Sequence, residues 1–251
     1  MQITKKLKQG FRHFSGCFSM GAEDIILASY PRSGSTWFRT IFANCINLKN
    51  GSDSPTSMLD LESVMPVLGF SNLGNKGPDY YRPRLIKTHR LAGEIKPLRP
   101  TKIFHLWREP KAVMKSCYRY FGANRNYQVD DLSSMIRDPK LGMPAWKKHY
   151  LAWAPAATVV LQYSMMRDHT VEQFSRVMSE LGYDELLPFV EGGVELANLE
   201  NMKKSEKAGI RDPQRFDKSF GSIGGSVSDK TTFSDSDLEY IESVAKGVLP
   251  E

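Results

Sequence analysis

Four short apolar or β-branched runs recur along the chain, and a helical pattern of apolar positions follows three of them. The runs predict β-strands over residues 24–29, 84–89, 102–107 and 158–163. The helical patterns predict helices over 36–46, 111–121 and 171–181, after the first, third and fourth runs. Strands and helices that alternate in this way are typical of a parallel sheet covered by helices. We therefore expect an α/β fold with a central parallel β-sheet flanked by helices.

Two polar stretches interrupt this pattern. Residues 50–83 are rich in Gly, Ser, Asn and Pro, which indicates a loop-rich insertion rather than core. Such an insertion is either a plain surface loop or a lid or acceptor pocket. Residues 209–237 are similarly polar and predict either a flexible connection or a Gly/Ser-rich loop that cradles an anion. A last helix is expected over 234–248, with a Ser-Asp pair as its cap.

A basic arm, residues 1–22, precedes the first strand. It carries Lys5, Lys6, Lys8 and Arg12 without an acid, and it lacks the apolar segment of a secretory signal. A solvated leading helix is favoured over contact with acidic lipids or a weak transit peptide. No function is assigned to the arm at this stage.

Composition narrows the class of protein. With 251 residues, of which 41% are hydrophobic, the chain suffices for one substantial core, and we expect a single domain over 1–251. No apolar run is long enough to span a bilayer. The three cysteines are widely spaced and form no CxxC pair, as is typical of thiols in a reducing cytoplasm. The net charge of +6 favours anionic partners, including nucleic acid, phosphate esters and sulfate esters, without choosing among them.

The segment YPRSGST, residues 30–36, directly follows the first predicted strand. A small polar loop between a strand and a helix lets backbone N–H groups converge on an anion at the helix N-terminus. The spacing differs from GxxxxGK[ST], the loop that binds nucleoside triphosphates. The pattern therefore indicates an anion site but leaves the anion open.

Two further strand ends carry similar groups. Lys87, Thr88 and His89 end the second predicted strand, and Arg108 ends the third, with Ser116 on the helix that follows. In open α/β sheets, ligands bind beyond the carboxyl ends of the strands. If these strands are neighbours, guanidinium, ammonium and imidazole groups face one multiply anionic ligand.

These segments resemble those of sulfotransferases that use 3′-phosphoadenosine 5′-phosphosulfate (PAPS), of the cytosolic or bacterial type that acts on small molecules. Residues 30–37 are similar to the PKSGTTW or PRSGSTW loop of that family, and KIFHLWREPKAVMKSCYRYF is similar to its second signature. The matches span about residues 24–180. The resemblance implies a three-layer sandwich like that of P-loop NTPases and a cytoplasmic enzyme. It also implies PAPS as sulfuryl donor, adenosine 3′,5′-bisphosphate (PAP) as product, no metal, no nucleic acid, and a small-molecule acceptor with a hydroxyl or amine.

The resemblance also assigns the donor's two anionic groups to matching residues. The residues expected to hold the 5′-phosphosulfate are Arg32, Ser33, Gly34, Ser35 and Thr36. Arg108 and Ser116 match the pair that binds the 3′-phosphate. The family's C-terminal loop carries an Arg-Lys pair and a Trp that this chain lacks, although KSFGSIGGSV keeps the frame of Gly221 and Gly224. Lys218, or else Lys230, is the expected substitute.

Three further roles concern the chemistry and the adenine ring. His89 lies in a KTH segment like the one whose His is the family's general base, and Lys87 and Arg32 are expected to stabilise charge on the departing oxygens. Trp37 and Tyr163 match the residues that contact adenine.

Alternative functions stay open at this point. A P-loop kinase or NTPase shares the fold, but the chain lacks GK[ST] and a strand ending in a Mg²⁺-binding Asp. A non-enzymatic module that binds nucleotides or nucleic acid would carry basic and aromatic residues on an open face. An acceptor pocket is expected from residues 50–83 and 120–145, whose aromatic and acidic candidates are Tyr80, Tyr81, Tyr118, Tyr120, Phe121, Tyr127, Asp130 and Asp131. The oligomeric state and the choice between O- and N-sulfation stay open.

Overall fold

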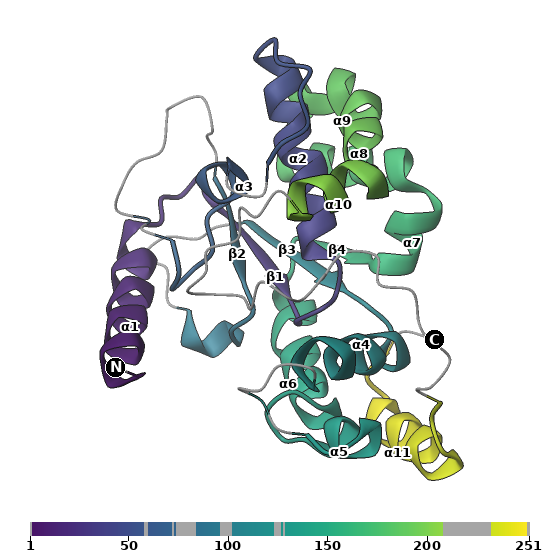
Figure 1. The fold of residues 1–251 in the computed structure, drawn as a ribbon. Helices are drawn as coiled ribbons and strands as arrows, with labels where there is room; N and C mark the ends of the chain where they lie inside the picture. The colour runs from purple at the N-terminus through teal and green to yellow at the C-terminus, as the bar shows by residue number, and fades with distance from the viewer. Residues whose placement is uncertain are drawn as a thin grey trace.

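The computed structural model of the chain describes residues 2–57, 60–71, 73, 84–95, 102–122, 127, 129–207 and 232–249. At its centre lies a four-stranded sheet in the order β2-β1-β3-β4, and every neighbouring pair of strands runs parallel (Figure 1). The strands are β1 (Ile25–Ser29), β2 (Leu85–Thr88), β3 (Lys102–Trp107) and β4 (Val159–Gln162). The prediction of these strands in a parallel sheet is confirmed.

Strand β1 is buried on both faces, which explains why its sequence is a continuous apolar run. Ile25 and Leu27 belong to one core cluster, and Ile26 and Ala28 belong to another. Because successive strand side chains point to opposite faces, the two clusters lie on opposite sides of the sheet. The sheet is therefore the middle layer of three.

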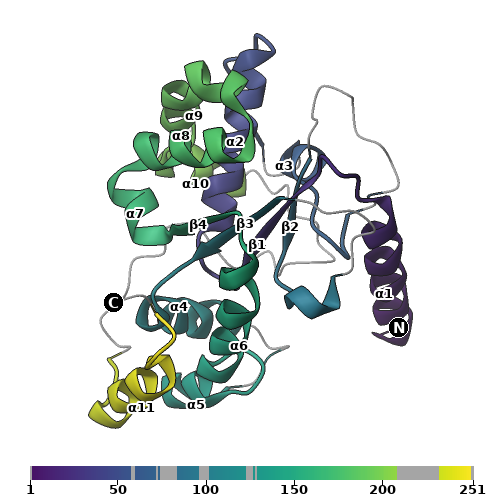
Figure 2. The ribbon, with the colours of Figure 1, turned by 180° about the vertical axis from the view of Figure 1, so that it is seen from behind.

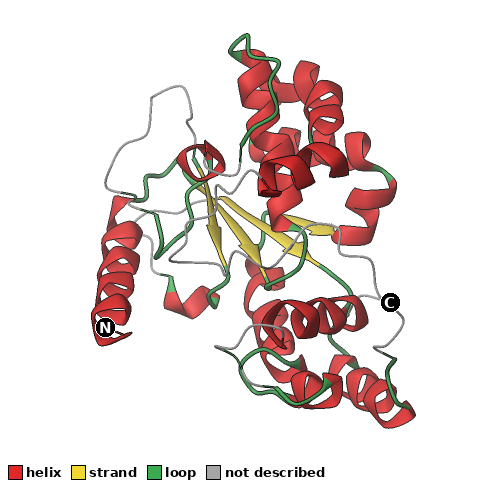
Figure 3. Ribbon diagram, viewed as in Figure 1, coloured by secondary structure: helices red, strands yellow, loops and turns green. Residues whose placement is uncertain are grey.

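Helices cover both faces of the sheet (Figures 2 and 3). Helices α2 (Ser35–Lys49), α8 (Thr170–Leu181) and α9 (Val190–Leu196) supply the cluster of Ile25. Helices α1 (Gln2–Ser19) and α6 (Met143–Trp153) supply the cluster of Ile26. The remaining helices are α3 (Asp60–Val64), α4 (Pro110–Cys117), α5 (Leu132–Arg137), α7 (Tyr163–Asp168), α10 (Leu199–Lys207) and α11 (Asp235–Ala245).

Part of the predicted insertion 50–83 belongs to the core, which corrects its interpretation as an excursion. Leu61 and Met65 are buried in the cluster around β1, and the backbone at Val67 pairs with β2. The Arg39 guanidinium donates to the Met65 carbonyl at 2.5 Å, which fixes this segment against α2. The abundance of turn-forming residues concealed a short apolar segment.

Two element ends also differ from the prediction. The predicted helix 111–121 ends as an α-helix at Cys117 and continues as a π-helical turn, Tyr118–Gly122. The predicted fourth strand stops at Gln162, and Tyr163 begins α7 instead of ending a strand. Tyr163 is therefore the first residue of a helix, and it lies at the carboxyl edge of the sheet.

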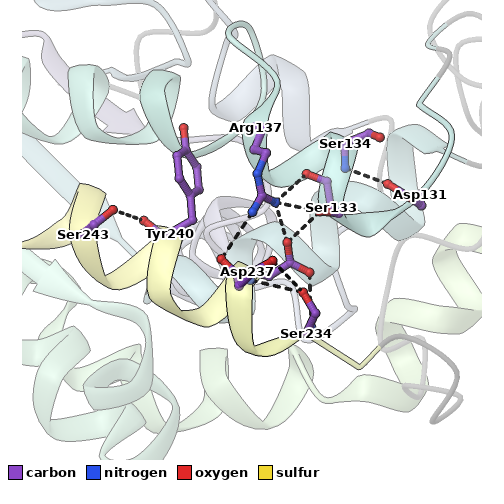
Figure 4. Close-up of polar contacts among 9 residues, drawn as sticks. Asp131, Ser133, Ser134, Arg137, Ser234, Asp237, Tyr240 and Ser243 are labelled. Atoms are coloured by element: carbon purple, nitrogen blue, oxygen red, sulfur yellow. Dashed lines mark hydrogen bonds and ion pairs between the residues drawn. The ribbon is translucent and has the colours of Figure 1, made fainter.

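Helix α11 is fixed to α5 by a network around Asp237 (Figure 4). The Asp237 carboxylate, which is buried, accepts hydrogen bonds from Arg137 at 2.5 Å and from Ser133 at 2.7 Å. Ser234 caps α11 as predicted, because its hydroxyl accepts from the Asp237 N–H at 3.2 Å. The described end of the predicted loop 209–237 is thereby anchored, whereas its residues 209–231 lie outside the described residues.

Candidate functional site

The loop between β1 and α2 has the backbone of an anion cradle. Arg32 and Gly34 both have positive φ, 67° and 92°, and α2 begins at Ser35. Alternation of left- and right-handed residues turns successive N–H groups toward one point, and the helix N-terminus adds its positive dipole end. A left-handed conformation at Arg32 is uncommon for a residue with a Cβ, and such backbone strain is typical of functional loops.

Gly34 is required by a neighbour as well as by its backbone. A Cβ at this position would lie 2.3 Å from Cδ2 of Tyr163 and 2.4 Å from its Cε2. The Tyr163 ring therefore packs directly on the loop. The ring also lies under the Arg108 guanidinium, whose carbon is 4.5 Å from the ring centroid.

The structure brings Arg32, Arg108 and Ser116 into direct contact, although they come from two separate strand ends. Arg32 Nε donates to the Ser116 hydroxyl at 3.1 Å, and Arg108 Nη1 donates to the Arg32 carbonyl at 3.2 Å. The Arg32 guanidinium also stacks on Tyr120 at 4.5 Å. Arg32 therefore reaches the hydroxyl that is expected to bind the other phosphate.

Trp37 lies beside Tyr163, with ring centroids 6.2 Å apart in an edge-to-face arrangement. Its indole N–H donates to the Ala197 carbonyl at 3.2 Å, so the ring is held between α2 and the end of α9. The two residues expected at the adenine thus form one aromatic corner next to the loop.

Three buried polar atoms at this edge have no hydrogen-bond partner within the described part of the chain. They are the hydroxyl of Ser29, the last residue of β1, the hydroxyl of Ser33, which is fully buried, and Nε of Arg108. Leaving such groups unpaired costs about 1–3 kcal/mol each, more for a charged group. An anionic ligand at the loop would satisfy both kinds of group, so the residues present fit a bound phosphate or sulfonate.

Electrostatics keep Arg108 and its neighbour Glu109 in defined states. The pKa of Arg108 is lowered, because burial outweighs the opposite effect of the nearby Tyr163 and Glu109. For Glu109, burial raises the pKa, but hydrogen bonds from Ser164 at 2.7 Å and Gln162 at 2.5 Å outweigh it, and the pKa falls. The Glu109 carboxylate is thus turned toward β4 and α7, and the Arg108 guanidinium remains a positive group at the sheet edge.

His89 follows β2 at the same edge and has a defined tautomer. Its Nδ1 lies 2.5 Å from the Ser29 carbonyl. Since a carbonyl only accepts, Nδ1 carries the hydrogen and Nε2 keeps a lone pair. Residue His89 is exposed to solvent. Desolvation by the surrounding protein, followed by the positive charge of Lys87, still lowers its pKa well below the usual value, so the ring is neutral near pH 7.

Lys87, Ser35 and Thr36 complete the set that the structure describes. Lys87 lies on β2 opposite Leu27 of β1, half-buried, and Ser35 and Thr36 form the first turn of α2. Lys218, Lys230 and the glycines at 221 and 224 lie outside the described residues, as do Tyr80 and Tyr81.

The described acceptor candidates differ in what they contact. Tyr118, Phe121 and Tyr127 pack against the cluster beneath α4 and α5, and the Tyr127 hydroxyl lies 2.5 Å from Asp138. Asp131 caps α5, because its carboxylate accepts from the Ser134 N–H at 2.7 Å. Tyr120 stacks on Arg32, a donor-site candidate.

Sequence reasoning named Tyr120 only as an acceptor candidate and missed its contact with Arg32, and it did not name Glu109. The sole sequence signal for Glu109 is that it follows Arg108, and none marks Tyr120 as the partner of a loop 88 residues away along the chain. Among the described residues, no group of three or more His, Cys, Asp or Glu side chains is placed to hold a metal ion.

Comparison with known proteins adds independent information. Residues 22–246 match the family model described as the sulfotransferase domain. Cytosolic sulfotransferase 8 of Arabidopsis thaliana is 27% identical over 231 residues, covering 80% of this chain and 69% of the relative. Rat sulfotransferase 1E1 is 22% identical, covering 75% of this chain and 68% of the relative.

Solved structures show a similar fold. Mouse sulfotransferase SULT7A1, complexed with PAP, aligns with a TM-score of 0.65 at 17% identity, over 94% of this chain and 88% of the other. Retinol dehydratase in complex with retinol and PAP aligns with a TM-score of 0.58 at 15% identity, over 92% of this chain and 84% of the other. At these identities the likeness concerns the fold.

Proposed function

The chain belongs to the sulfotransferase domain family, and on that basis we propose that it transfers a sulfuryl group from PAPS to a hydroxyl or amine of a small-molecule acceptor. The observation that carries the proposal is the pair of unpartnered buried groups, the Ser33 hydroxyl and Arg108 Nε, at adjacent strand ends. Two anion positions side by side suit a ligand with two anionic groups. PAP, which is bound in the similar structures, carries one phosphate at the 3′ position and one at the 5′ position of its ribose.

The donor's 5′ side is assigned to the loop after β1. The N–H groups from Gly34 to Thr36, the Ser33 hydroxyl and the start of α2 hold the anion, as at other strand-to-helix loops, while the Ser33 N–H donates to the Tyr30 carbonyl at 3.2 Å. Lys87, one strand over, supplies a positive charge to the same group. Bound there, the donor supplies a sulfuryl group whose leaving group is the 5′-phosphate of PAP.

The 3′-phosphate is assigned to Arg108 and Ser116, and the adenine to the corner of Trp37 and Tyr163. Arg32 connects the two anion positions, since its backbone belongs to the first loop and its guanidinium contacts Ser116. Its catalytic role is to neutralise charge on the phosphate oxygen that departs from sulfur. Replacement by Ala is therefore expected to lower turnover more than it weakens PAP binding.

His89 is assigned as the general base. Its Nε2 accepts the proton of the acceptor hydroxyl while the acceptor oxygen bonds to sulfur and the bond from sulfur to the 5′-phosphate oxygen breaks. The carbonyl of Ser29 holds the ring in the tautomer that this step requires. A sulfuryl group carries less charge than a phosphoryl group, so positioning and fixed positive groups supply the stabilisation.

The acceptor class is supported by the ligands of similar solved structures and by one contact in this chain. The similar solved structures include retinol dehydratase with retinol and with androsterone, which are apolar molecules carrying oxygen. We propose that the acceptor approaches from the side of Tyr120, which stacks on Arg32. The plant relatives are named cytosolic sulfotransferases, and the three cysteines of this chain are free and buried, which supports a cytoplasmic location.

Thermal shift distinguishes this proposal from its main rival. PAP without metal is expected to raise the melting temperature, since a ligand that binds only the folded state stabilises it by mass action. ATP with Mg²⁺ is expected to give a smaller shift. Stabilisation by ATP with Mg²⁺ and none by PAP would favour a P-loop kinase, and tight binding of single-stranded RNA without PAP binding would favour a nucleic-acid module.

A further inference from the structure

Helix α1 carries a stripe of exposed phenylalanines that the proposed chemistry does not use. Phe11, Phe14 and Phe18 are 73%, 63% and 52% exposed. At 3.6 residues per turn, positions 11, 14 and 18 share one face of the helix. The rings of Phe14 and Phe18 contact each other, with centroids 4.6 Å apart. Together, Phe11, Phe14 and Phe18 form the Phe stripe.

The opposite face of α1 is firmly attached to the protein. Cys17, in the last turn of the helix, and Met20, just after it, are buried in the cluster that includes Ile26. A Cβ at Gly16 would lie 2.8 Å from side-chain atoms of Leu68 and Leu73, so the helix approaches this segment as closely as a glycine allows. Arg12 donates to the Phe70 carbonyl at 3.0 Å. The Phe stripe therefore faces outward on a helix whose orientation is fixed.

The charged residues in the sequence of α1 have one sign. The helix sequence contains Lys5, Lys6, Lys8 and Arg12 and no acid, and the first acid of the chain is Glu23. Exposed aromatic residues on a helix that carries Lys and Arg and no acid are typical of helices that lie in the interface of a negatively charged membrane.

We propose that α1 binds the surface of membranes containing anionic lipids, with the Phe stripe inserted among the lipid headgroups and the basic residues near the phosphates. No helix in the described part of the chain is long and apolar enough to cross a membrane, so the contact is peripheral. Figures 1 and 2 show α1 at the outer edge of the molecule on the side of β2, accessible to a flat surface.

Two other occupants fit the observations less well. In a dimer formed through the Phe stripe, two acid-free basic helices would face each other, and their like charges would repel. A groove of an acidic protein that encloses a helix needs access to most of its circumference, but α1 is attached to the protein by its inner face. A membrane needs only the outward face.

The experiment is vesicle co-sedimentation of the full chain. Wild-type protein is expected to sediment with phosphatidylcholine vesicles that contain about a third phosphatidylserine, and not with pure phosphatidylcholine. Phe11→Ser/Phe14→Ser is expected to reduce partitioning at least about tenfold, given the transfer free energy of a Phe side chain. Lys5→Gln/Lys8→Gln is expected to reduce it about tenfold or more, at about fivefold per cation near an anionic surface.

The matched control replaces exposed apolar residues elsewhere. Leu151 and Leu199 are 49% and 50% exposed, and Leu151→Ser/Leu199→Ser is expected to leave partitioning unchanged. All variants are expected to keep the melting temperature shift with PAP, so failure here is distinguishable from failure of the proposed function. The proposal is overturned if wild type stays in the supernatant with the anionic vesicles. It is equally overturned if the control variant loses partitioning as strongly as the Phe variant, or if the stripe instead mediates dimers in sedimentation velocity.

Discussion

Replacing Ser116 with Ala separates the two anion positions. The Ser116 side chain lies on α4, is 7% exposed, and accepts a hydrogen bond from Arg32 Nε at 3.1 Å. If this hydroxyl also binds the 3′-phosphate of PAP, its removal weakens only ligands that carry that phosphate. Adenosine 5′-monophosphate, which lacks it, serves as the comparison ligand.

The magnitude follows from the kind of bond that is lost. A hydrogen bond to a charged group contributes about 1.5–3 kcal/mol, and about 1.4 kcal/mol corresponds to a tenfold change in Kd. The Kd of PAP is therefore expected to rise about 10- to 150-fold in Ser116→Ala, toward the lower end because Ser116 already has a partner in the free protein. The Kd of adenosine 5′-monophosphate is expected to change less than about twofold. Loss of the acceptor for Arg32 also lowers the free energy of unfolding by about 1–3 kcal/mol.

Isothermal titration calorimetry of both ligands, at a temperature where the variant is folded, measures this difference. Ser179→Ala is the control. Ser179 is also a helical serine, on α8, and its hydroxyl donates a hydrogen bond to the Asp184 carboxylate at 2.8 Å. It is expected to bind both ligands as wild type does. Equal weakening of the two ligands by Ser116→Ala, or no weakening of PAP, would refute the assignment of the 3′-phosphate to α4.

The remaining predictions concern the loop and two histidines. Gly34→Ala is expected to weaken PAP binding more than tenfold in calorimetry, because its Cβ displaces the Tyr163 ring; Gly51→Ala, with a similar φ of 82° and no atom within 4 Å, is expected to leave binding unchanged. Burial lowers the pKa of His149 to about 3. The unfolded chain therefore binds a proton that the folded chain does not as pH falls from about 6.5 to about 3, and the free energy of unfolding drops by about 4–5 kcal/mol. His149→Phe is expected to make acid denaturation curves less steep, and unchanged curves would contradict the origin of the effect. The lowered pKa of His89 keeps the base neutral, so kcat/KM is expected to stay level as the pH is lowered through 6.5 and to fall only at lower pH. His89→Gln is expected to lower kcat/KM about 10²–10⁴-fold. A fall of kcat/KM that sets in at or above pH 6.5 would be inconsistent with His89 as the base.

Local sequence patterns predicted what depends on local structure. The strand at Ile25–Ser29 is a continuous apolar run because both faces are buried, and the loop that follows is recognisable from its glycine and hydroxyls. Parallel neighbours then bring the strand ends together, as expected for Lys87, His89 and Arg108.

Contacts between distant segments could not be read from the same patterns. The hydrogen bond from Arg32 to Ser116 joins residues 84 apart and depends on the direction of a long side chain. The stacking of Tyr120 on Arg32 depends on the π-helical turn after α4, which rotates that segment relative to a continued α-helix. Similarly, Tyr163 meets Gly34 because β4 ends one residue early and a helix begins there.

The central claim is that this sheet edge transfers a sulfuryl group from PAPS with His89 as base. Its most direct test is incubation of the purified protein with radiolabelled PAPS and a protein-free small-molecule extract of its own source. The account predicts that label appears in a new acceptor, that PAP forms in equal amount, and that both are lost in His89→Gln while PAP binding is kept. Intact PAPS after incubation with wild type, or equal transfer by His89→Gln, would contradict it.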